Sequence, residues 1–172
     1  MARAETLKPP SAAEVVQVQT AKQMRDAVIN ALDRSTIVIK AAAVSDFTVR
    51  NPADQKIKRK GAITLDLEPT TDILAEIAAR KGPRIVVGFA AETNDALENA
   101  RKKLQSKSLD AIVINDVSRP GIGFDSERNA VTILTQSGMV EVPETSKWEV
   151  AHRVLDAVAR LRVERGAASA RS

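Results

Sequence analysis

The sequence predicts an α/β fold in which a Rossmann-like parallel sheet is flanked by helices. Short apolar runs of strand length alternate with segments whose apolar residues recur at helical spacing, and this alternation is typical of a parallel sheet. The 172 residues, of which 44% are hydrophobic and 28% charged, suffice for one domain with its own core. No stretch approaches the roughly 18 uninterrupted apolar residues of a membrane helix, and the N-terminus lacks a secretory signal. We therefore expect a cytoplasmic protein that does not contact a membrane.

The first elements form a βαβ pattern. Residues 14–19 are predicted to form a short strand. Thr20 and Gln23 have the spacing of a capping box, which satisfies the free amide groups of a first helical turn. A helix is therefore expected from this point to about Asp33, and residues 36–39 then have the composition of a fully buried strand.

Two more helix–strand pairs and a hairpin follow. The expected helices are residues 72–80 and 94–105, and the expected strands are residues 84–88 and 111–114. Residues 131–134 and 140–142 are expected to form a C-terminal hairpin. Ser146 and Glu149 form a second capping box, which predicts a final helix that ends near Arg162. The predicted organisation is a flexible segment at 1–11, one domain at 12–162 and a disordered tail at 163–172.

The segment from Asp46 to Pro69 is too long for a simple connection between elements. It contains the alternating residues Ile63, Leu65 and Leu67, which predict a half-buried strand. We interpret the segment as a protruding β arm. Because a protruding strand has no core of its own to cover its apolar face, pairing with a second copy is expected, with the hairpin at 131–142 as a further contact.

The composition limits the chemistry that the chain can carry. There is no cysteine and only one histidine, His152, which excludes disulfides, thiol catalysis and a structural zinc site. Any metal is therefore expected to be Mg²⁺ held by oxygen atoms. The net charge of +4 fits either nucleic acid or a small polyphosphate ligand. Aromatic residues make up only 2% of the chain, which argues against a platform for unpaired bases, so we expect no nucleic-acid partner.

Polar residues follow three of the predicted strands, where open α/β sheets bind their ligands. No glycine-rich phosphate loop, Walker motif or nucleophile elbow is present. Taken singly, each of these polar residues is better explained as a helix cap or a turn former. Three strands that end in the same way favour a ligand site. The residues concerned are Ser45, Asp46, Glu92, Thr93, Asn115 and Asp116.

Basic residues gather in two places. The run from Lys56 to Lys60 follows a polar loop that could fold over an anion. Lys103 and Lys107 lie four residues apart, on and just beyond one expected helix, and share a face if that helix continues to Lys107. A solvated charged face is the alternative explanation for both groups.

Five ordered motifs resemble the phosphopantothenate-cysteine ligase family, also called phosphopantothenoylcysteine synthetase, which forms the ligase half of a bifunctional bacterial coenzyme A biosynthesis protein. The resemblance covers residues 12–162. The motifs are Ala41-Ala-Ala-Val-Ser-Asp-Phe47, Lys56-Ile-Lys-Arg59, Pro69-Thr-Thr-Asp-Ile-Leu74, Val87-Gly-Phe-Ala-Ala-Glu-Thr93, and Ile114-Asn-Asp-Val117 followed by Gly123-Phe-Asp-Ser126.

The resemblance implies CTP-dependent ligation of 4'-phosphopantothenate to L-cysteine through an acyl-cytidylate, with CTP as co-substrate and Mg²⁺ as cofactor. It implies that Lys56 is catalytic, that Asp46 holds the metal, and that Ala42 and Ala43 contact the substrate. The residues implied to contact CTP are Lys40, Ala41, Ala42, Asp46, Lys56, Thr71, Asp72, Ile73, Leu74, Phe89, Lys103 and Lys107.

The resemblance also implies a homodimer in which a partner's residues complete each site, and a flavin-dependent decarboxylase domain in the full-length family protein. Compared with the family, the sequence lacks the first βα unit, so a partial domain is expected. A non-catalytic module that binds CTP and dimerises is therefore the alternative to an active ligase. A nicotinamide-binding domain is disfavoured because the glycine fingerprint is absent.

Overall fold

The computed structural model describes residue 11 and residues 13–58, 61–92, 95–116 and 126–169. Several predictions lie wholly or mainly outside these residues. They concern the flexible segment at 1–11, the polar residue Thr93, the basic residues Arg59 and Lys60, the motif residues 123–125 and the end of the tail at 170–172.

The chain folds into helices and strands in the order α1 (Ala21–Leu32), β1 (Ile37–Lys40), β2 (Phe47–Val49), β3 (Leu67–Pro69), α2 (Ile73–Ala79), β4 (Ile85–Glu92), α3 (Ala96–Ser106), β5 (Ala111–Asp116), β6 (Arg128–Thr135), β7 (Met139–Ser146) and α4 (Lys147–Ser169). Within the described residues, no helix is long and apolar enough to cross a membrane.

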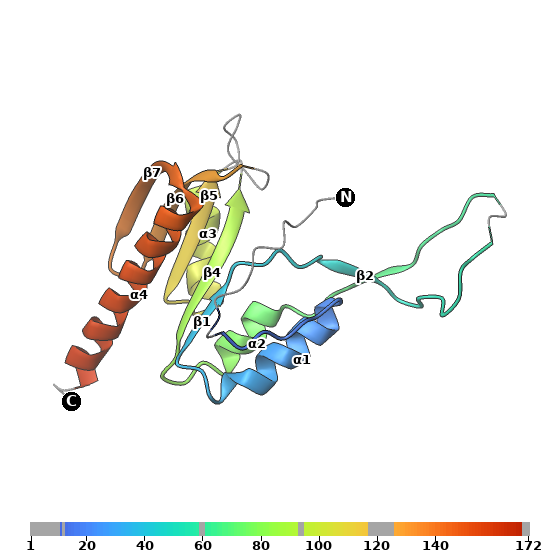
Figure 1. The fold of residues 1–172 in the computed structure, drawn as a ribbon, viewed down its shortest axis with the longest axis horizontal. Coiled ribbons are helices and arrows are strands. Elements are labelled where there is room, and N and C mark those ends of the chain that lie inside the picture. The colour runs from blue at the N-terminus through green and yellow to red at the C-terminus, as the bar shows by residue number, and fades with distance from the viewer. Residues whose placement is uncertain (1–10, 12, 59–60, 93–94, 117–125, 170–172) are drawn as a thin grey trace.

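A five-stranded sheet in the order β1-β4-β5-β6-β7 forms the centre of the fold (Figure 1). β1, β4 and β5 run parallel, with Val38 opposite Val86 and Ala90 opposite Ile114. The hairpin β6–β7 continues the same sheet in the antiparallel sense. The structure therefore confirms the α/β fold, and it adds that the sheet is mixed.

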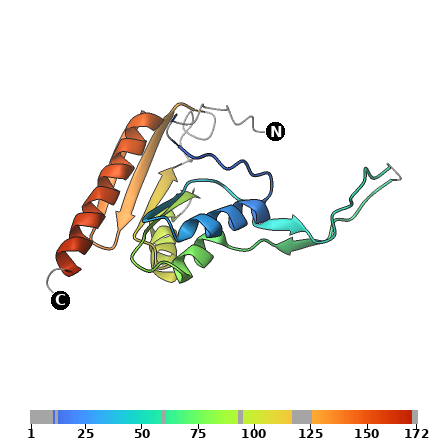
Figure 2. The ribbon, with the colours of Figure 1, turned by 60° about the horizontal axis from the view of Figure 1, so that its bottom comes forward.

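The sheet separates two apolar clusters, because neighbouring residues of a strand point to opposite faces. On one face Val86, Ile112 and Ile114 pack with residues of α1, α2 and α3. On the other face Val87, Val113 and Ile133 pack against α4. Figures 1 and 2 show α4 on one side of the sheet and the other three helices on the opposite side.

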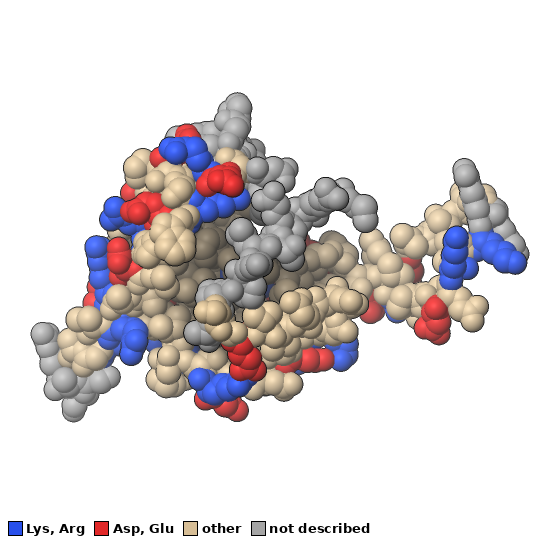
Figure 3. All heavy atoms as spheres, viewed as in Figure 1, with Lys and Arg blue, Asp and Glu red and all other residues tan. Residues whose placement is uncertain are grey.

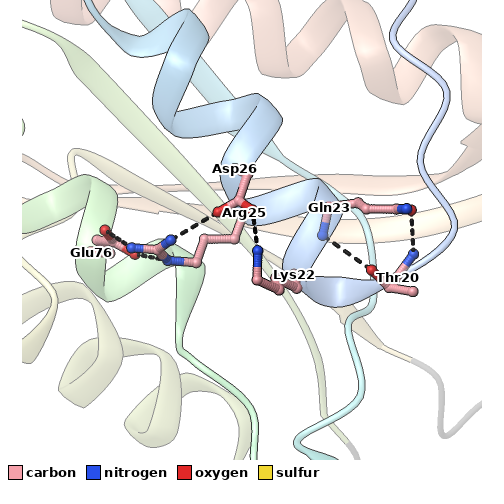
Figure 4. Close-up of polar contacts among 6 residues, drawn as sticks. All are labelled: Thr20, Lys22, Gln23, Arg25, Asp26 and Glu76. Atoms are coloured by element: carbon pink, nitrogen blue, oxygen red, sulfur yellow. Dashed lines mark hydrogen bonds and ion pairs between the residues drawn. The ribbon is translucent and has the colours of Figure 1, made fainter.

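Helix α1 begins as the sequence predicts, because the capping box of Thr20 and Gln23 is complete (Figure 4). The Gln23 N–H donates to Thr20 Oγ1 at 3.1 Å, and the Thr20 N–H donates to Gln23 Oε1 at 3.2 Å. One turn later, Arg25 donates two hydrogen bonds to the Glu76 carboxylate of α2, at 2.6 and 2.7 Å. This bidentate pair fixes α2 relative to α1.

A buried carboxylate joins α4 to the sheet. Asp110, which is 6% exposed, accepts a hydrogen bond from the Val86 N–H at 2.7 Å and pairs with Lys81 Nζ at 2.8 Å. Arg165 of α4 pairs with the same carboxylate and donates to the Arg84 carbonyl at 2.8 Å. These contacts hold the end of α4 in place, so the helix continues through residue 169 and its expected end at Arg162 is wrong.

Two predicted strands differ from the structure. Residues 14–19 form no strand, although Val16 and Val18 line a groove together with Val38 of the edge strand β1. In the arm, only Leu67 of the alternating residues belongs to a strand, which pairs Phe47–Val49 with Leu67–Pro69. An isolated two-stranded ribbon is marginally stable, which explains why the pairing ends a few residues from the body of the domain.

Candidate functional site

A cleft of about 260 Å³ lies between the loop that follows β1, the start of α2 and the end of α3. Its size is near the lower end of the range for ligand pockets, roughly 300 Å³. The lining residues are Lys40, Ala42, Ala43, Val44, Asp46, Thr70, Thr71, Asp72, Ile73, Leu74, Phe89, Lys103, Lys107, Leu109 and Ile112.

Thr70 fixes the two loops that form one wall of the cleft. Its N–H donates to the Asp46 carbonyl at 2.9 Å, and its hydroxyl donates to the Ser45 carbonyl. These bonds join the segment after β1 to the segment before α2 at the base of the arm. The backbone of residues 42–46 is therefore held beside residues 70–72.

The floor of the cleft is apolar and depends on Gly88. A Cβ at this position would lie 3.0 Å from Leu74 Cδ2 and 3.1 Å from Leu109 Cδ1. Glycine thus lets Leu74 and Leu109 lie directly against β4. The sequence had indicated Gly88 only as part of a motif.

The rim of the cleft is charged. Lys40 donates from Nζ to the Ala42 carbonyl at 3.2 Å, and Lys107 Nζ lies 2.6 Å from Asp72 Oδ2. Asp72 also caps α2, because its Oδ1 accepts the Ala75 N–H at 3.1 Å. Partial burial raises the pKa of the Asp72 carboxyl group, but the hydrogen bonds from Lys107 and Ala75 outweigh burial, so this pKa lies below its ordinary value. The cleft therefore presents lysines together with one ionised carboxylate that already has a partner.

The structure brings together most of the residues that the sequence assigns to CTP. All of them line the cleft except Ala41 and Lys56. Phe89 is among the lining residues. It also packs against the apolar cluster on the α4 face of the sheet. A contact between its ring and cytosine stays a prediction.

Lys56 lies on the arm, between β2 and the far end of the connecting loop. The arm, residues 46–69, extends away from the sheet (Figures 1 and 2), and Lys56 does not line the cleft. Figure 3 shows Lys and Arg atoms gathered at the far end of the arm. Lys56 is therefore not placed to act in the cleft of its own chain, and a catalytic role would require the arm to bring it to a cleft.

Among the polar residues after the strands whose side chains the structure describes, only Asp46 lines the cleft. The Asn115 Oδ1 atom is buried and has no hydrogen-bond partner among the described residues. The side chains of Glu92 and Asp116, and all of Thr93, lie outside the described part of the chain.

Sequence reasoning missed four residues of the cleft, namely Val44, Thr70, Leu109 and Ile112. Thr70 lies inside a motif that the sequence had already indicated, so its position was available as a signal. Ile112 belongs to an apolar run that predicts a buried strand, and Leu109 is an apolar residue just before that run, so neither carries a signal for a site.

Within the described residues, no group of three or more histidine, cysteine, aspartate or glutamate side chains could hold a metal ion. Asp46 is exposed at the rim of the cleft and could supply a single carboxylate. One carboxylate fits a Mg²⁺ ion that is held mainly by the phosphates of its ligand, and it does not fit an all-protein metal site.

A family model for the C-terminal domain of DNA/pantothenate metabolism flavoproteins matches residues 2–161. The chain belongs to this family. It is 46% identical over 161 residues to the coenzyme A biosynthesis bifunctional protein CoaBC of Bacillus subtilis (strain 168), and the match covers 92% of this chain and 40% of that protein. The chain thus spans about two fifths of the length of this relative.

Solved structures of similar fold agree with the family. The C-terminal domain of a coenzyme A biosynthesis bifunctional protein CoaBC has a TM-score of 0.76 and 32% identity, over 92% of this chain and 71% of that chain. A Cab2 mutant in complex with phosphopantothenate-cysteine has a TM-score of 0.53 and 17% identity, over 77% of this chain and 45% of that chain. The second likeness concerns the fold alone.

Proposed function

We propose that this chain is the CTP-binding and catalytic portion of a phosphopantothenate-cysteine ligase that acts in coenzyme A biosynthesis. One observation carries the proposal. Residues from three of the sequence motifs, together with Lys40, Lys103 and Lys107, line one cleft with lysines at its rim and an apolar floor. The family to which the chain belongs, and its similarity to a bifunctional coenzyme A biosynthesis protein, support the same proposal.

The proposed reaction has two steps. The carboxylate of 4'-phosphopantothenate attacks the α-phosphorus of CTP, which forms the acyl-cytidylate and releases pyrophosphate. The amine of cysteine then attacks the acyl carbon, which forms the amide and releases CMP. An acyl phosphate anhydride activates the carboxylate for amide formation, and the first step needs positive charge because two anions must approach each other.

The residues of the cleft suit these steps. Lys40, Lys103 and Lys107 would neutralise the triphosphate, and Mg²⁺ bound to the phosphates and to Asp46 would supply further charge screening. The backbone around Thr71 and Asp72 offers hydrogen-bonding groups for recognition of cytosine. The small side chains of Ala42 and Ala43, which line the cleft, would leave room for the pantothenate chain beside the α-phosphate.

Lys56 would act from the arm of a second copy. Ile57, Ile63 and Leu65 of the arm are 60%, 63% and 58% exposed, so a large apolar surface on this segment is uncovered. Pairing of two arms about a two-fold axis would bury that surface and would extend the short β2–β3 ribbon. Each arm could then carry Lys56 to the cleft of the partner. In the whole protein, a flavin-dependent decarboxylase domain would accompany the ligase.

The first prediction concerns CTP itself. We expect the chain to bind CTP with Mg²⁺, and isothermal titration calorimetry at millimolar CTP measures this directly. A folded chain that gave no heat and no shift in its thermal unfolding midpoint would contradict the assignment of the cleft to a nucleotide.

The second prediction concerns the arm. Replacing Ile63 and Leu65 together with Asp should give monomers that bind CTP weakly or not at all, because charged side chains cannot remain in an apolar interface. Light scattering at tens of micromolar reports the mass. Val163→Asp is the matched control, because Val163 is 72% exposed on α4 and lies far along the chain from the arm. A monomeric wild-type chain with CTP binding intact would disprove the shared site.

An alternative function is a module that binds CTP and dimerises without turnover. The observation that favours it is that Lys56, which the resemblance implies to be catalytic, does not line the cleft of its own chain. Binding of CTP is common to both candidates, so release of pyrophosphate separates them.

A further inference from the structure

The ion pair between Asp72 and Lys107 lies at the rim of the cleft and joins the ends of two helices. Lys107 ends α3, where its N–H donates to the Lys103 carbonyl at 3.1 Å. Asp72 begins α2 and holds Lys107 Nζ at 2.6 Å from its Oδ2. The side chains of Lys107 and Asp72 are 28% and 48% exposed, so a ligand in the cleft can reach both.

The Asp72 carboxylate disfavours the binding of an anionic ligand in the cleft. Lys40, Lys103 and Lys107 are the lysines that line the cleft, and Asp72 neutralises one of them while no anion is bound. A phosphate group that takes Lys107 must compete with Asp72 for the ammonium group and must also tolerate the nearby negative charge. In water, one unit charge about 4 Å away changes the affinity for a singly charged group roughly fivefold.

We propose that Asp72 is a displaceable counterion of Lys107, which an entering polyphosphate replaces and which takes Lys107 back when pyrophosphate leaves. The inference rests on the proposed function for the identity of the ligand. If Asp72 is such a counterion, it weakens the binding of both CTP and pyrophosphate. Weaker binding of pyrophosphate speeds its release. Asp72 acts here through Lys107 and is a positioning residue.

Two substitutions and their combination test the exchange in a double-mutant cycle. Asp72→Asn removes the charge and keeps the helix cap, because Asn and Asp are equally good at this position. Lys107→Gln removes the ammonium group and keeps most of the length of the side chain. Inorganic tripolyphosphate is the probe, titrated by calorimetry at fixed ionic strength into the wild-type chain, both single variants and the double variant.

We expect Asp72→Asn to bind tripolyphosphate about fivefold more tightly than the wild type. We also expect Lys107→Gln to lower the affinity at least threefold more in the Asp72→Asn background than in the wild type. In the wild type, tripolyphosphate must displace Asp72 to reach Lys107, so this lysine contributes less to binding there. Asp33→Asn is the matched control. Asp33 pairs with Arg84 at 3.4 Å outside the cleft, so the same change in net charge should leave the affinity within about twofold.

Three outcomes would overturn the inference. Unchanged or weaker binding by Asp72→Asn would mean that the carboxylate orients Lys107 or only supports the fold. Equal costs of Lys107→Gln in the two backgrounds would mean that the ligand leaves the pair intact. Absence of tripolyphosphate binding in all four proteins would remove the anion site. Because tripolyphosphate carries no cytosine, the expected pattern without any binding of CTP would contradict the proposed function and leave this inference standing.

Discussion

Replacing Lys56 with Gln should slow formation of the acyl-cytidylate by two orders of magnitude or more in a catalytically active form of this protein. A charge contact that forms in the transition state is worth about 3 kcal/mol, and the amide of Gln cannot replace an ammonium group beside developing negative charge. Folding should be spared because Lys56 is exposed on the arm. Single-turnover release of pyrophosphate from CTP measures the step, and circular dichroism confirms the fold.

Lys58 provides the control for Lys56. It is exposed on the same segment two residues later, so Lys58→Gln makes the same change in charge. We expect the rate with Lys58→Gln to stay within severalfold of the wild-type rate, because a lysine that only faces solvent contributes through weak, screened interactions. Equal losses from the two variants, or from Lys60→Gln, would mean that the arm contributes general positive charge and that Lys56 has no special role.

Replacing Asp110 with Ala should lower the free energy of unfolding by about 3 kcal/mol. The change leaves Lys81 and Arg165 without their shared carboxylate, and it leaves the Val86 N–H of a buried strand without a hydrogen-bond acceptor. The end of α4 should fray in this variant, because Arg165 then keeps, among the described residues, its bonds to the backbone carbonyls of Pro83 and Arg84. Urea denaturation followed by circular dichroism measures the change in stability.

Asp66→Ala is the matched comparison for Asp110. Asp66 forms an ion pair of 3.1 Å with Arg50 on the arm, and its side chain is 65% exposed. Exposed pairs of this kind contribute at most about 1 kcal/mol, so this variant should be nearly as stable as the wild type. A loss of less than 1 kcal/mol for Asp110→Ala would show that the buried cluster is not a main support of the fold.

The sequence predicted the regular elements where periodicity was strong. The apolar runs at β1, β4, β5 and the hairpin became strands of one sheet, and the capping box at Thr20 located the start of α1. Other elements differ from the prediction. Residues 14–19 have strand composition but form no ladder with the edge strand β1. α4 outlasts its apolar pattern because Arg165 reaches Asp110, and this contact leaves no trace in local sequence.

The candidate site was predictable as a set of residues and not as an arrangement. The residues that the resemblance implies to contact CTP, from Lys40 to Lys107, indicated the lining of the cleft, whereas the pairing of Lys107 with Asp72 depends on how α2 and α3 pack. The distance of Lys56 from the cleft depends on the direction of the arm, which follows from the contacts at its base, including the bonds of Thr70 to Ser45 and Asp46. Spacing along the chain carries no information about that direction.

Release of pyrophosphate tests the proposed ligase most directly. The chain is mixed with CTP, Mg²⁺ and 4'-phosphopantothenate in the absence of cysteine, and pyrophosphate is measured with a coupled enzyme assay. We predict release that requires both CTP and 4'-phosphopantothenate and that rises further when cysteine is added, because cysteine discharges the acyl-cytidylate and frees the site. No release from a folded chain that binds CTP would contradict catalysis and would identify the chain as a binding module.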